Sequence, residues 1–85
     1  MAKVMITDNT ATQVSGPARR VIVQVNAALT GTIKVIDNTS GTTANVATIT
    51  DPGVGARFEY WDFEVGVRIV ASTTCNITVS TSDNR

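Results

Sequence analysis

The chain has 85 residues, and its seven basic residues (Lys and Arg) are balanced by seven acidic residues (Asp and Glu), which gives a formal net charge of zero. This length fits one domain, residues 1–85; a single cysteine and no histidine exclude an internal disulfide and remove the commonest zinc ligand, so we expect no metal or other cofactor. The sequence has no basic cluster beyond Arg19-Arg20 and no run of 18 apolar residues, which argues against a nucleic-acid partner and against a membrane.

The composition favours strands. The chain contains 12 Val, 7 Ile and 14 Thr against one Leu and two Glu, and β-branched residues are stiff at χ1 and pack well on a pleated sheet. We predict an all-β fold, a small antiparallel β-sandwich or jelly-roll-like barrel of six to eight short strands. A domain this small is marginally stable alone, so we expect added stability from homo-oligomerisation or from docking onto a larger body.

The first strands lie before residue 27. Residues 1–14 are expected to form an N-terminal arm or an edge strand, with a polar strand at about residues 10–14, and a Ser-Gly-Pro turn follows. The next strand, "RRVIVQVN", residues 19–26, alternates apolar and polar side chains. Its predicted core face consists of Val21, Val23 and Val25.

Two hairpins are predicted after that strand. "TIKVIDN", residues 32–38, directs Ile33 and Val35 to one face and Ile36 to the other; "TSGTT" then makes a turn and "NVATI" resumes the extended run. "DPGVG", residues 51–55, is a loop. Near the C-terminus a second hairpin is predicted around "STT", and its core face consists of Val65, Val67, Ile69, Cys75, Ile77 and Val79.

All of the aromatic residues lie in "RFEYWDFEV", residues 57–65. On a regular strand Phe58 and Tyr60 point to one face and Trp61 to the other, so one core cannot bury all four rings. Either a bulge near Trp61 returns every ring to the core, or Trp61 faces a partner. The candidate interface residues, with the basic pair as the second choice, are Arg19, Arg20, Arg57, Phe58, Tyr60, Trp61 and Phe63.

A catalytic constellation is not evident in the sequence. A Ser, Thr or Cys nucleophile needs a general base, and without histidine that base is a lysine or a carboxylate. Asp62 and Glu64 flank Phe63 and could form a glycosidase pair or a calcium site, but two acids on the solvent face of a strand are the ordinary result of alternation. We predict that the protein is not an enzyme and that Cys75 is a small buried apolar residue.

Residues 15–80 contain, in order, a Gly-Pro turn, a Val-rich strand ending in Asn, a "GT-I-V-D-TSG" hairpin, the aromatic segment, and a Gly-Val strand followed by a Thr-rich hairpin. This order of turns and strands resembles that of small β-sandwich structural proteins of tailed bacteriophage virions. The resemblance implies a capsid decoration or cement subunit, or another small virion component, at the capsid surface after synthesis in the host cytoplasm.

The implied partners are the major capsid protein or other virion proteins, together with further copies of the chain. A trimer is the expected oligomer because capsid lattices offer threefold sites. The alternative from another functional class is a carbohydrate-binding or host-attachment module, for example in a tail or fibre, with Tyr60 and Trp61 stacking on sugar.

Overall fold

The strand-forming composition produces eight strands. The structure is a computed structural model that describes residues 2–41 and 43–82; Met1 of the expected arm or edge strand and the last three residues of the expected domain lie outside this part. The strands are β1 (Ala2–Ile6), β2 (Thr12–Ser15), β3 (Ala18–Val25), β4 (Thr32–Asp37), β5 (Asn45–Thr50), β6 (Arg57–Phe63), β7 (Val67–Ala71) and β8 (Ile77–Ser82).

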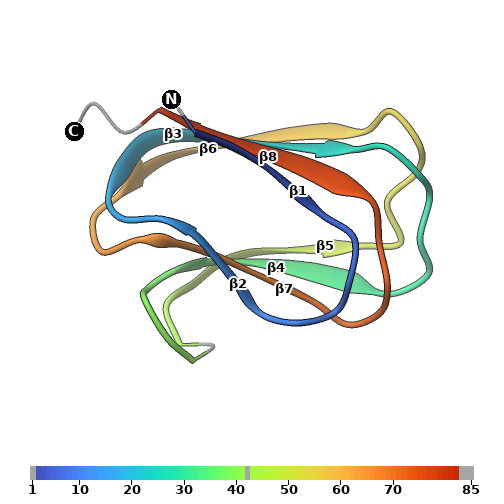
Figure 1. Ribbon diagram of the computed structural model, residues 1–85, viewed down its shortest axis with the longest axis horizontal. Helices are drawn as coiled ribbons and strands as arrows, with labels where there is room; N and C mark the ends of the chain where they lie inside the picture. Colours follow the sequence, from blue (N-terminus) through green and yellow to red (C-terminus); the bar gives the residue numbers. More distant parts are fainter. Residues whose placement is uncertain (1, 42, 83–85) are drawn as a thin grey trace.

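The strands form two four-stranded antiparallel sheets that face each other (Figure 1). Sheet A has the order β1-β8-β3-β6 and sheet B the order β2-β7-β4-β5. The pairs β1 with β8, β2 with β7, β3 with β6 and β4 with β5 are those of one long antiparallel ribbon, folded over so that alternate pairs lie in opposite sheets. This connectivity is a jelly roll, and the predicted all-β sandwich of six to eight strands is confirmed.

The core lies between the sheets and is built by alternation along each strand. In β3 the predicted face is correct: Val21, Val23 and Val25 are at most 1% exposed. Sheet B contributes the predicted Ile33 and Val35 of β4, both fully buried. The predicted central hairpin is also correct, because β4 pairs with β5 from Thr32↔Thr50 onward.

Two expectations about faces and pairing are wrong. The segment around "STT" is not a hairpin: β7 pairs with β2 and β4 in sheet B, whereas β8 pairs with β1 and β3 in sheet A. The chain crosses between the sheets there, and Ser72 is bound to Thr32 by a backbone hydrogen bond of 2.9 Å. Ile36, expected on the outer face, is fully buried, at the position where the β4–β5 register shifts.

Two residues of the predicted C-terminal core face, Val65 and Cys75, also differ from expectation. Val65 is 48% exposed and precedes β7, while Cys75 is half-buried and precedes β8. Both residues lie in segments that cross between sheets, where the strand alternation from which they were assigned does not apply. The remaining members of that face, Ile69 among them, are buried.

One acidic side chain joins the sheets at the crossing from β6 to β7. The Asp37 carboxylate, at the end of β4, accepts backbone N–H bonds from Glu64 (3.0 Å), Val65 (2.8 Å) and Gly66 (3.1 Å). Beside it, the Gln13 amide nitrogen lies 3.0 to 3.1 Å from three backbone carbonyl oxygens. The bonds to Asp37 hold the segment between β6 and β7 against the end of β4. Small domains often use disulfides for such cross-links.

Candidate interaction surface

The aromatic segment forms β6, which lies at the edge of sheet A and, within residues 2–41 and 43–82, pairs only with β3. Phe58 and Tyr60 point inward and pack against the core, each half-buried, and Phe63 is 1% exposed. Burial raises the pKa of the Tyr60 hydroxyl. Trp61 points the other way and is 58% exposed. The segment therefore presents one ring to the surface.

The local backbone explains how Phe63 returns to the core while Trp61 does not. Asp62 has a φ of +61°, a left-handed conformation that is uncommon outside glycine and that interrupts the alternation of the strand. Because the irregularity follows Trp61, it corrects the face of Phe63 only. The interpretation in which a bulge returns all four rings to the core is wrong for Trp61.

Arg20 connects the outward side chains of two neighbouring strands. It stands opposite Trp61 in the β3–β6 pairing, and its guanidinium carbon lies 5.1 Å from the centroid of the indole ring, within the range of a cation–π contact. Its Nε donates to Glu59 Oε1 at 3.0 Å, and its Nη2 donates to the same oxygen. The hydrogen bond from Arg20 is the main cause that lowers the pKa of Glu59. We call these three residues the Arg20 cluster.

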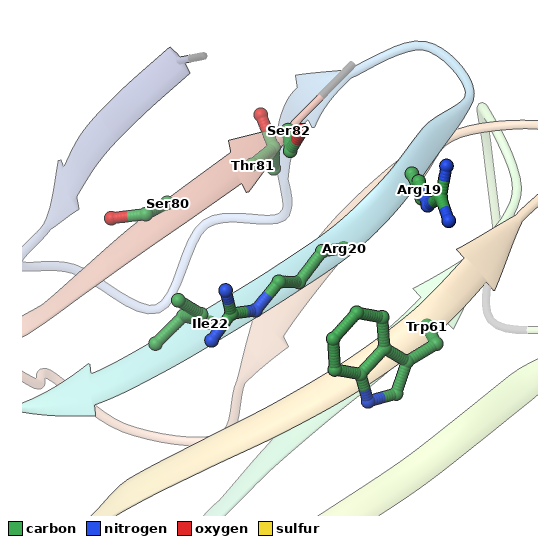
Figure 2. Close-up of a pocket in the computed structure, with 7 residues that line it drawn as sticks. All are labelled: Arg19, Arg20, Ile22, Trp61, Ser80, Thr81 and Ser82. Carbon is green, nitrogen blue, oxygen red and sulfur yellow. The ribbon is translucent and has the colours of Figure 1, made fainter. Parts of the chain in front are cut away.

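A hollow of about 240 Å³ lies beside this cluster on the outer face of sheet A (Figure 2). Arg20 and Trp61 border it from neighbouring strands, and β8 supplies hydroxyl groups on the far side. Its lining residues are Arg19, Arg20, Ile22, Trp61, Ser80, Thr81 and Ser82. Chemically, the hollow suits an apolar group that carries a carboxylate or hydroxyl at its edge, because guanidinium and Ser hydroxyl groups surround an aliphatic and an aromatic surface.

The structure separates the seven candidate residues into three groups. Arg19, Arg20 and Trp61 meet at the hollow, and Arg57 lies exposed at the start of β6. Phe58, Tyr60 and Phe63 belong to the core or pack against it. Sequence reasoning missed the contribution of β8, Ser80 and Ser82, because it paired β8 with β7. Their signal was present in the alternation "ITVSTS", whose hydroxyl residues at every second position mark a polar sheet face.

The other residues considered for chemistry lie apart from the hollow. Asp62 and Glu64 are exposed on either side of Phe63, and within residues 2–41 and 43–82 there is no group of three or more His, Cys, Asp or Glu that could hold a metal ion. Cys75 Sγ lies 3.6 Å from the backbone oxygens of Ile6 and Asp8, and burial is the main cause that raises its pKa.

Among the described residues, no helix is long and apolar enough to span a membrane. Comparison with known proteins gives no match for this chain among family models, curated proteins or solved structures.

Proposed function

We propose that the chain is a structural virion protein of a tailed bacteriophage, a capsid decoration or cement subunit that binds and stabilises the head. The observation that carries the proposal is the exposed Trp61 ring, which lies against the Arg20 guanidinium on the outer face of sheet A beside the hollow. Trp and Arg are the residues most enriched at the centres of protein interfaces. The jelly roll adds weight because viral capsid domains commonly use it.

In this proposal the capsid is stabilised by the number of copies that bind to it. The hollow and the Arg20 cluster are small, so one contact with the major capsid protein is modest in strength. Many copies, each touching neighbouring shell subunits, gain effective affinity from simultaneous engagement. Self-association is part of the proposal, and the expectation of a trimer rests on the threefold sites of capsid lattices alone.

A carbohydrate-binding or host-attachment module is the second candidate, since lectins also use jelly rolls. The observation in its favour is an exposed ring next to the hydroxyl groups of Ser80 and Ser82. This candidate lacks a second ring for stacking on sugar, because Tyr60 packs against the core. Arg20 also lies over the Trp61 ring at 5.1 Å, so a sugar would have to stack on the opposite face of the ring or displace Arg20.

Two measurements test the proposal. Quantitative mass spectrometry of purified source virions should find the chain at a copy number comparable with that of the capsid subunits. Purified protein should cosediment with source capsids that lack it, and Trp61→Ala should weaken this binding by about 2 kcal/mol or more. Met5, 65% exposed on β1 of the same sheet, provides the control, and Met5→Ala should bind like the wild type.

The Trp61→Ala variant must also remain folded. Since the ring is 58% exposed, we expect its removal to cost less than about 1.5 kcal/mol of folding stability, against roughly 3 to 5 kcal/mol for a core aromatic residue. Absence of the chain from virions together with no capsid binding would refute the proposal. Glycan binding that depends on Trp61, without capsid binding, would instead establish the second candidate.

A further inference from the structure

Strand β6 is the longest of the four edge strands. Natural proteins guard edges with short strands, charged side chains (especially Lys), Pro or bulges. Strand β1 has five residues and carries Lys3, β2 has four residues with a register shift, and β5 pairs with β4 through a register shift. Strand β6 has seven residues, contains neither Lys nor Pro, and keeps one register with β3 without interruption from Arg57 to Trp61, before the irregular Asp62.

The backbone groups that β6 directs toward this edge can be assigned. The Val25 N–H donates to the Ala56 carbonyl at 2.8 Å, so Ala56 faces β3. In an antiparallel ladder both polar groups of one residue point to the same side, and successive residues alternate. Arg57, Glu59 and Trp61 therefore direct their backbone N–H and C=O groups away from β3, toward the open edge.

We propose that two copies of this chain pair through β6, antiparallel, about a twofold axis at Phe58. This joins the two A sheets into one continuous sheet of eight strands. Arg57 of each copy then lies opposite Glu59 of the other, and both residues offer edge-directed backbone groups. Phe58 meets its own counterpart on the inner side. The contact is isologous, since the same strand serves on both sides, so it gives a dimer in place of the trimer expected from capsid lattices.

The charges select this register among those that the backbone allows. An axis at Glu59 places two carboxylates opposite each other, and an axis at Tyr60 places Glu59 opposite Trp61. Only the axis at Phe58 pairs opposite charges at both symmetric positions, which stabilises an antiparallel ladder. Glu59 can serve two partners, because both bonds from Arg20 go to Oε1 and Oε2 can accept from the second copy's Arg57.

Burial gives an independent reason for the pairing. Phe58 and Tyr60 pack against the core yet remain only half-buried, at an edge beyond which the described residues place no further strand. A second sheet beyond the edge covers their remaining surface, and removal of aromatic area from water is favourable. Zero net charge adds little repulsion between the copies.

Charge reversal tests the register by sedimentation equilibrium. The wild type should show a monomer–dimer equilibrium. Arg57→Glu and Glu59→Arg, each alone, should weaken dimerisation about tenfold or more, because each places like charges at two symmetric positions. An equimolar mixture of the two variants should recover the wild-type dimer, since each strand then meets opposite charges. Lys3→Glu on the β1 edge is the matched control and should leave the constant unchanged.

Amide hydrogen exchange tests the backbone pairing directly. As the protein concentration rises, the amides of Arg57 and Glu59 should become protected, while those of the β5 edge should not. A chain that stays monomeric at millimolar concentration would overturn the inference, as would an oligomer that Arg57→Glu does not weaken. If Glu59→Arg does not fold by circular dichroism, Arg57→Glu and the exchange pattern still decide the question.

Discussion

The hydrogen bonds to the Asp37 carboxylate should contribute strongly to the folding stability, and Asp37→Ala tests this. The substitution removes the acceptor of three backbone N–H groups, at 3.0, 2.8 and 3.1 Å, of which the one on Gly66 is partly buried. A hydrogen bond to a charged group contributes about 1.5 to 3 kcal/mol, but the two exposed amides regain water when the carboxylate is lost. We therefore expect a loss of about 2 to 4 kcal/mol, less than the sum of three bonds.

That loss is measurable by urea and thermal unfolding at one fixed protein concentration. For a domain of this size each kcal/mol lowers Tm by about 4 to 8 °C, so Tm should fall by roughly 10 to 30 °C. Asp37→Asn keeps one carbonyl oxygen and should lose about half as much free energy. Asp8 accepts one bond, from the exposed Thr10 N–H, and Asp8→Ala should change the stability by less than about 1 kcal/mol. Equal losses for Asp8→Ala and Asp37→Ala would refute the reasoning.

Three further predictions concern single side chains. Gly66→Ala should cost about 1 to 3 kcal/mol in urea unfolding, because the new Cβ would lie 2.8 Å from Gln13 Nε2; wild-type stability would contradict this. Glu59 should titrate below 4.5 by NMR, because Arg20 lowers its pKa. The ion pair between Glu59 and Arg20 is fully present above pH 4.5 and is lost as the pH falls through the lowered pKa of Glu59. An unshifted titration would count against the contact between Arg20 and Glu59. Cys75 should react with a thiol reagent at pH 8 more slowly than a cysteine peptide, because burial raises its pKa; equal rates would contradict the burial, and unfolding in urea should restore the peptide rate.

The sequence predicted local structure well where alternation alone decides it. The valines of β3 and the β4–β5 hairpin follow from period-two patterning and an adjacent turn, so short stretches of sequence contain the required information. Trp61 followed the same rule, since alternation placed it opposite Phe58 and Tyr60. Arg20 could be placed on the outer face of β3, but its contact with Trp61 could not, because that contact depends on which strand lies beside β3.

The pairing of distant strands was the part that the sequence could not supply. The turn residues between β7 and β8 are equally compatible with a hairpin and with a crossing between sheets, and only the full set of partners separates the two. The hollow was missed for this reason: Ser80 and Ser82 approach Arg20 only because β8 lies next to β3. The burial of Phe63 required Asp62 to adopt a positive φ, and no turn signal at that position predicts it.

The position of β8 between β1 and β3 governs the order in which the fold can form. Val4 pairs with Val79, and Val79 pairs in turn with Val23, so in the sheet that the structure describes β1 has no neighbour until β8 has been synthesised. At about 5 to 20 residues per second, translation leaves β1 and one side of β3 unpaired for several seconds. We therefore expect sheet A to close late, by insertion of β8 between β1 and β3, and this high contact order to slow folding.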